Sequence, residues 1–151
     1  MSLTSGQQAP DFTLQDQDGN AVTLAGFRGR KLVLYFYPKD DTPGCTTEAC
    51  QFNDSLDRFQ REDVAVVGIS ADDGESHQRF RAKFGLNFPL LVDDGGEVAK
   101  AYGSWGEKTY GDRTFTGTLR STFLIDEQGK ISQAWYDVRP DGHPEAILAT
   151  L

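Results

Sequence analysis

Two short apolar runs rich in β-forming residues constrain the fold more than any other feature of this sequence. Lys31 to Tyr37 and Val64 to Ile69 are each typical of a strand buried on both faces. Between them, apolar residues recur at helical spacing from Cys45 to Phe59, which predicts an amphipathic helix. A strand, a helix and another buried strand in this order favour an α/β domain.

The rest of the chain continues this alternation and then changes it. A late antiparallel hairpin counts against a flavodoxin-like sheet and favours a thioredoxin-like α/β fold. We therefore expect a mixed central sheet flanked by helices, with an N-terminal β-hairpin extension, in one domain over residues 1–151. The other predicted elements are an N-terminal hairpin (12–14 and 21–24), helices (75–84, 97–102 and 143–151), a strand (88–92) and the late hairpin (122–125 and 131–138).

Charge and hydropathy exclude several classes of function. The formal net charge is −8, so nucleic acid and anionic lipid, which need a basic surface, are poor partners. The longest apolar run, Leu32 to Tyr37, is far too short to span a membrane. The opening residues MSLTSGQQAP lack the basic and long apolar segments of a secretory signal, which favours a cytoplasmic location.

Both cysteines of the chain lie in the stretch PKDDTPGCTTEAC, at the predicted start of the amphipathic helix. Thr42 followed by Pro43 is a helix-start signal, because a hydroxyl can cap free backbone N–H groups and proline suits the first helical position. Cys45 would then be the third helical residue, among unpaired N–H groups at the positive end of the helix dipole. That environment favours thiolate over thiol, so Cys45 is expected to be reactive.

Cys50 follows five positions later on the same predicted helix. Five residues correspond to a rise of about 7.5 Å, and they turn the second side chain away from the first. The separation exceeds the roughly 7 Å between Cα atoms that an unstrained disulfide tolerates. The two thiols can therefore bond only if the start of the helix unwinds.

Other interpretations of the cysteines and acidic residues are weaker. Cys45 could be a small buried hydrophobe, but the helix-start context argues against that. Two cysteines do not complete a zinc site, and His77 and His143 lie in different elements, where we interpret them as ordinary surface or cap residues. The acidic turn at residues 16–20 lacks the glycine and the closing glutamate of a calcium loop. We expect neither a metal nor another cofactor.

The cysteine segment also resembles a known family. Pro38, Thr42 and Cys45 match the Pro-x-x-x-Thr-x-x-Cys signature of the peroxiredoxins, and the stretch YFYPKDDTPGCTTEAC is similar to the bacterioferritin-comigratory-protein type, also called the Q subfamily. The likeness covers nearly the whole chain, continuing through residues 67–70, 102–108 and 120–126.

The resemblance implies a thioredoxin-fold enzyme that reduces hydrogen peroxide and organic hydroperoxides without metal or haem. Cys45 would be the peroxidatic cysteine, and Cys50 would resolve it as an intramolecular disulfide that thioredoxin or a similar dithiol reduces. Thr42 would hydrogen-bond the thiolate and the peroxide, while Pro38 would shield the pocket from water. Members of this subfamily are often monomers, and a monomer is expected here.

The resemblance also assigns residues outside the cysteine pair. Arg120 would be the catalytic arginine, and Pro43, Gly44 and Glu48 would belong to the pocket. Glu48 either orients that arginine or is an exposed acid favoured by the helix dipole. Trp105 either lines the pocket or is a core or lid aromatic. The sequence departs from the family at residues 109–117, TYGDRTFTG, which bears on the shape of the substrate.

Two other functions would use the same cysteines. A peroxide-sensing redox switch would also begin with oxidation of Cys45, but it would not turn over continuously with a dithiol reductant. A thiol–disulfide oxidoreductase is less well supported, because that family carries Cys-x-x-Cys and this chain carries Cys-x-x-x-x-Cys.

Overall fold

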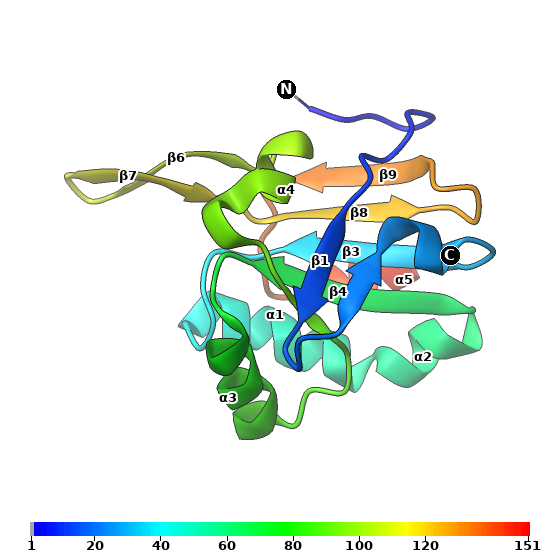
Figure 1. Ribbon diagram of the computed structural model, residues 1–151, viewed down its shortest axis with the longest axis horizontal. Helices are drawn as coiled ribbons and strands as arrows, with labels where there is room; N and C mark the ends of the chain where they lie inside the picture. Colours follow the sequence, from blue (N-terminus) through cyan, green and yellow to red (C-terminus); the bar gives the residue numbers. More distant parts are fainter. Residues whose placement is uncertain (1) are drawn as a thin grey trace.

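The centre of the protein is a mixed sheet of seven strands in the order β2-β1-β5-β4-β3-β8-β9 (Figure 1). The computed structural model describes residues 2–151. Strands β3, β4 and β5 are parallel, whereas β1, β2, β8 and β9 pair antiparallel with their neighbours. The strands are β1 (Thr13–Asp16), β2 (Ala21–Thr23), β3 (Lys31–Phe36), β4 (Val64–Ser70), β5 (Leu90–Val92), β8 (Ser121–Ile125) and β9 (Ile131–Tyr136).

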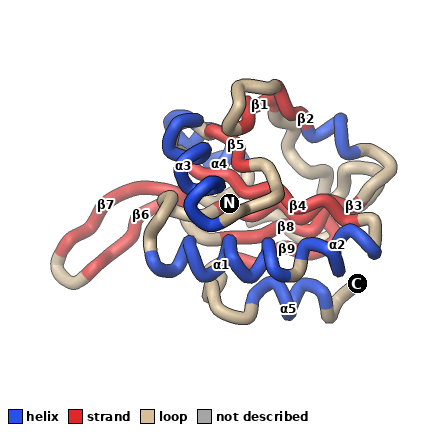
Figure 2. The backbone as a smooth tube through the Cα atoms, turned by 90° about the horizontal axis from the view of Figure 1, so that it is seen from below, coloured by secondary structure: helices blue, strands red, loops and turns tan. Residues whose placement is uncertain are grey.

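Helices cover both faces of this sheet. Figure 2 shows α1, α2 and α5 together on one face, with α1 and α5 side by side. The helix α3 packs into the same core as α1, and α4 packs into the core on the other face. The helices are α1 (Pro43–Asp54), α2 (Leu56–Arg61), α3 (Gly74–Phe84), α4 (Glu97–Ala101) and α5 (His143–Leu148), with 3-10 turns at Leu24–Phe27 and Asp94–Gly96.

The central strand β3 is buried on both faces, as its sequence predicts. Successive side chains of a strand point to opposite faces, so alternate residues should enter different cores. Val33 and Tyr35 pack in the core beneath α1, while Leu32, Leu34 and Phe36 pack in the other. The mixed sheet, the flanking helices and the N-terminal hairpin β1–β2 confirm the predicted fold class.

The long helix predicted from Cys45 to Phe59 is two helices. The first ends at Asp54, and α2 begins at Leu56, with Ser55 between them outside regular helical geometry (φ −96°, ψ 1°). The apolar face nevertheless continues across the break, because Phe52, Leu56 and Phe59 all enter one core. The helical spacing therefore predicted the buried face correctly but not the interruption.

A further hairpin, β6 (Trp105–Tyr110) and β7 (Arg113–Thr118), was not predicted from the sequence. It forms a separate two-stranded sheet that projects from the body of the protein (Figure 1). Most of β7 is exposed, so it lacks the apolar alternation that identifies a half-buried strand.

Within residues 2–151, no helix has both the length and the apolar character needed to cross a membrane.

Candidate active site

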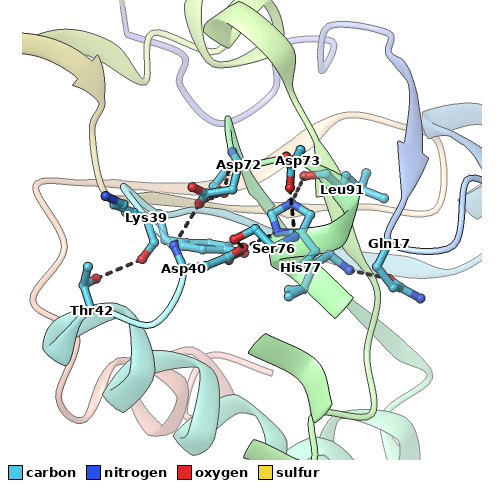
Figure 3. A network of polar contacts seen from close by, with 12 residues as sticks. Gln17, Lys39, Asp40, Thr42, Asp72, Asp73, Ser76, His77 and Leu91 are labelled. Atoms are coloured by element: carbon cyan, nitrogen blue, oxygen red, sulfur yellow. Dashed lines mark hydrogen bonds and ion pairs between the residues drawn. The ribbon is translucent and has the colours of Figure 1, made fainter. Parts of the chain in front are cut away.

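The start of α1 places Cys45 at a helix N-terminus. Thr42 is the N-cap residue, with extended backbone angles (φ −103°, ψ 157°), and Pro43 is the first helical residue. Cys45 is then the third, and it is 1% exposed. The sequence predicted that the Thr42 hydroxyl would cap the helix, and this is wrong. The hydroxyl donates instead to the Lys39 carbonyl at 2.9 Å (Figure 3), because that nearby oxygen competes for it.

Arg120 bridges the Cys45 sulfur and a buried acid. It directly precedes β8, and its Nη2 donates to Sγ of Cys45 at 3.3 Å. Its Nη1 donates to Oε1 of Glu48 at 2.6 Å. Glu48 is fully buried, so the alternative of an exposed acid is wrong. The one guanidinium therefore contacts both groups at once.

Burial controls the charge of this cluster. It raises the pKa of Glu48 from 4.5 to about 7, although the charge and hydrogen bond of Arg120 oppose that rise. Burial also disfavours the charged form of Arg120, but the charges of Glu48 and Cys45 outweigh it and raise the pKa of the guanidinium. Arg120 is therefore a fixed positive charge beside the sulfur.

Gly44 lets the guanidinium approach the helix start closely. A Cβ atom at this position would lie 3.1 Å from Nη2 of Arg120 and 3.3 Å from Cγ of Pro140. Both distances are tighter than ordinary van der Waals contact, so a side chain here would push against the arginine. The glycine of the Thr-Pro-Gly-Cys sequence thus has a packing reason specific to this site.

A cavity of about 760 Å³ opens over Cys45. One part of its wall comes from the loop before α1 and from the start of α1, and another comes from the projecting hairpin. Trp105 lines the cavity and also packs against the core, so it has both of the positions expected for it. Glu48, which was expected in the pocket, is fully buried and does not line this cavity. The lining residues that the sequence pointed to are Pro38, Thr42, Pro43, Gly44, Cys45, Trp105 and Arg120.

Lys108 is a lining residue whose importance the sequence did not reveal. It lies on β6, and burial lowers the pKa of its ammonium group, as does the nearby charge of Arg120, while the charge of Cys45 raises it. Its only sequence signal was membership of the WGEK segment. A second cation therefore faces the cavity beside Arg120.

Cys50 lies on the same unbroken helix as Cys45, and both thiols are free. It is partly exposed, and burial together with Asp54 raises the pKa of its thiol. A raised pKa favours the protonated form, which is the less reactive one. The two cysteines therefore have different environments within one helix.

Both histidines are buried, so our interpretation of them as surface or cap residues is wrong. His77 on α3 is fully buried, with Nδ1 2.6 Å from Oδ2 of Asp40. His143 begins α5, and its Nε2 lies 2.8 Å from Oγ1 of Thr122. Burial lowers the pKa of His143 to about 4, helped by Arg120. Isolated histidines carry no periodic signal that would predict such burial.

Comparisons with known proteins agree on the family to which the chain is similar. The AhpC/TSA family model matches residues 5–134. A putative peroxiredoxin of Mycobacterium tuberculosis is 51% identical over 141 residues, covering 93% of this chain and 90% of the relative. Peroxiredoxin Bcp of Bacillus subtilis is 44% identical over 151 residues, covering 100% and 96%.

Solved structures agree with these relatives. The bacterioferritin comigratory protein of Xanthomonas campestris, in a study of its alkyl peroxide reduction activity, superposes with a TM-score of 0.89 at 38% identity, covering 97% of this chain and 96% of that one. The chain therefore belongs to the AhpC/TSA family. Its similarity to Bcp and Q-type peroxiredoxins confirms the resemblance and the enzyme class predicted from the sequence, a thiol peroxidase.

Proposed function

We propose that the protein reduces hydroperoxides by attack of the Cys45 thiolate on the terminal peroxide oxygen. The thiolate forms a bond to that oxygen while the O–O bond breaks, which oxidises the sulfur to sulfenic acid. The other oxygen leaves and takes a proton, giving water or an alcohol. The observation that carries this proposal is the guanidinium of Arg120, which donates to Sγ of Cys45 and to Glu48 at once.

Arg120 has two roles in this step. Its positive charge stabilises the reacting thiolate, and its donors can stabilise the negative charge that grows on the peroxide oxygens as the bond breaks. Glu48 holds the guanidinium in this orientation through the 2.6 Å bond. Because both groups are largely withdrawn from water, little reorganisation is needed during the reaction.

Thr42 can accept a hydrogen bond from the substrate. Its hydroxyl hydrogen is already given to the Lys39 carbonyl, so the oxygen is left as an acceptor. A peroxide O–H is a matching donor. Pro38 lines the same cavity and brings no N–H group, which suits the role of excluding water beside the sulfur.

We expect the cavity to admit organic hydroperoxides in addition to hydrogen peroxide. A volume of about 760 Å³ is far more than hydrogen peroxide needs, and Trp105 and Phe115 supply apolar surface. The Xanthomonas campestris neighbour has been studied for its alkyl peroxide reduction activity. We extend that substrate class to this chain.

Cys50 completes the cycle in our proposal. Its thiol attacks the sulfenic acid of Cys45, forms an S–S bond and releases water. Since α1 is intact through both cysteines, its first turns must unwind before the sulfurs can meet. A dithiol reductant such as thioredoxin then returns both thiols. This cycle suits a monomer in a reducing compartment, and we propose the cytoplasm.

A peroxide-consumption assay with thioredoxin, thioredoxin reductase and NADPH tests this function. We expect continuous turnover by the wild-type chain and none by Cys45→Ser. A single stoichiometric oxidation without turnover would instead favour a redox switch. Mass spectrometry of the oxidised chain should find a Cys45–Cys50 disulfide within one molecule, and disulfide-linked dimers alone would contradict the proposed resolution step.

A further inference from the structure

A buried network of hydrogen bonds holds Asp40, in the middle of the loop 38–42 that leads into α1 (Figure 3). Its side chain is 3% exposed. Oδ1 accepts from the hydroxyl of Tyr37 at 2.6 Å, and Oδ2 accepts from the hydroxyl of Ser76 at 2.9 Å. The backbone N–H of Asp40 donates to Asp72 at 2.8 Å. The network therefore fixes both the side chain and the backbone of this loop residue.

His77 joins the network through both of its ring nitrogens. Nε2 lies 2.8 Å from the carbonyl oxygen of Leu91, which can only accept a hydrogen bond, so Nε2 carries a proton. Nδ1 lies 2.6 Å from Oδ2 of Asp40. A carboxylate also only accepts, so Nδ1 must carry a proton too. The contacts are satisfied by an imidazolium paired with a carboxylate.

We propose that the Asp40–His77 pair is a positioning element for peroxide reduction, which holds the loop 38–42 in its working place only while His77 carries its second proton. The inference rests on the proposed function of Cys45. Loss of that proton would leave two lone pairs facing each other at 2.6 Å, which is repulsive. The contact would open, and of the two side chains of α3 that hold Asp40 only Ser76 would remain.

The loop carries this effect to the cavity. Pro38 and Thr42 lie on either side of Asp40, and both line the cavity over Cys45. Thr42 is also the N-cap residue of α1, so its backbone sets where the helix begins. A displacement of about 1 Å in a reacting geometry can cost on the order of 10²-fold in rate. A modest loop movement would therefore slow the reaction.

Two acids near His77 favour its protonated form. Asp40 faces it from the loop and Asp72 from the residues after β4, while the Tyr37 ring lies 6.4 Å away on the same side as Asp40. Just before α3, the carboxylate of its capping residue Asp73 accepts from the backbone N–H of Ser76. Among the described residues, Asp40 and Asp72 are therefore the acids that act on the imidazolium.

These acids decide the direction of the pH dependence. Burial works against a charged imidazolium, but the hydrogen bond and charge of Asp40, the Leu91 carbonyl and Asp72 outweigh it, so the pKa of His77 lies above its ordinary 6.5. A group with a raised pKa stabilises the fold below its unfolded value, and that contribution is lost as pH rises through the folded value. The loop is therefore released on the alkaline side.

The rate of Cys45 oxidation by hydrogen peroxide, measured by stopped-flow fluorescence across pH, tests the proposal. Past the pKa of the pair, the wild-type rate should fall by up to about tenfold per pH unit. Asp40→Asn should keep the neutral-pH rate and lose the fall, because its amide can donate to an unprotonated Nδ1 while its oxygen still accepts from Tyr37. Asp41→Asn removes the same charge one residue away at an exposed site and should behave like wild type.

The proposal would be overturned if the oxidation rate of Asp40→Asn fell at alkaline pH as much as that of wild type. It would also be overturned if the wild-type rate did not decline at alkaline pH. Nitrogen-15 NMR of the histidine rings in the wild-type chain gives a second test. This test can be made even if Asp40→Asn fails to fold. The chain has two histidines. At neutral pH His77 should show two protonated nitrogens and His143 one, and a neutral His77 in the wild-type chain would contradict us. This reading needs no peroxide, so its failure is distinct from a failure of the proposed function.

Discussion

The two walls of the cavity differ in how firmly the fold holds them. The start of α1, with Cys45 and Glu48, is built into the core beneath the sheet. The opposite wall is the hairpin β6–β7, which pairs only with itself and projects from the body (Figure 1). The wall formed by the start of α1 is suited to chemistry that depends on fixed distances. The wall formed by the hairpin is suited to accommodating substrates of different shape.

The largest effect is expected from Cys45→Ser, which changes the wall formed by the start of α1. We expect peroxide turnover to disappear, a loss of at least about 10³-fold, because a serine hydroxyl is not ionised near neutral pH and oxygen is a weaker nucleophile toward peroxide. Thioredoxin-coupled NADPH oxidation measures this. Cys50→Ser is the matched control, since it should still undergo one oxidation of Cys45 but should not recycle. Wild-type turnover by Cys45→Ser would remove the assigned nucleophile.

Arg120→Ala should have the next largest effect. Losing a preorganised donor typically costs about 10² to 10³ in rate, and Arg120 supplies one to the Cys45 sulfur. The second-order rate constant for peroxide, from stopped-flow fluorescence, measures the loss. Arg113→Ala removes an exposed arginine of the hairpin and should change little. Equal rate constants for wild type and Arg120→Ala would remove the guanidinium from the reaction.

Glu48→Gln should slow the reaction roughly tenfold, because a neutral amide holds the guanidinium less strongly than a carboxylate does. It should also change the pH dependence of stability. With its pKa raised from 4.5 to about 7, Glu48 binds its proton more tightly in the folded state, so the free energy of unfolding falls as pH rises across that window. Because His143 and other groups also titrate, urea unfolding should show the fall as a difference, with wild type and the exposed control Glu75→Gln losing stability relative to Glu48→Gln as pH rises from about 4.5 to about 7.

Gly44→Ala should cost several-fold in rate, on the order of 3- to 10-fold, with little change in stability. The added methyl group would lie 3.1 Å from the guanidinium and shift it relative to Cys45. The second-order rate constant for peroxide would report the shift. Gly117→Ala is a suitable control, because an added Cβ there meets nothing within 4 Å. Identical kinetics of Gly44→Ala and wild type would mean that the arginine tolerates displacement.

Local patterns predicted the frame of the site well. The apolar runs that form β3 and β4 and the Thr-Pro start of α1 are short-range signals, and they placed Cys45 correctly as the third helical residue. The capping bond of Thr42 failed because the hydroxyl had another acceptor nearby, the carbonyl of Lys39. Propensity identified the position but could not decide between two local hydrogen bonds.

Local sequence patterns could not predict contacts between residues that are far apart in the chain. Arg120 reaches Cys45 across 75 positions, and only the family resemblance singled it out. The Asp40–His77 contact spans 37 positions and depends on how α3 packs against the loop, so nothing in the sequence predicted it. The hairpin β6–β7 was missed because most of β7 is exposed and carries no apolar alternation.

The smallest effect is expected from a substitution in the wall formed by the hairpin β6–β7. Phe115 lines the cavity and is 46% exposed, so its ring offers apolar surface to a bulky substrate. Phe115→Ser should raise KM for cumene hydroperoxide by roughly two- to threefold and leave the rate with hydrogen peroxide unchanged, because partial burial of one ring is worth about 1 kcal/mol or less. Steady-state kinetics with both peroxides measure the ratio. Thr114→Ser, a conservative change at an exposed position on the same strand, should leave that ratio at the wild-type value. An equal loss with both peroxides would mean that the hairpin also positions the reacting groups, and the division between a chemical wall and a substrate wall would be wrong.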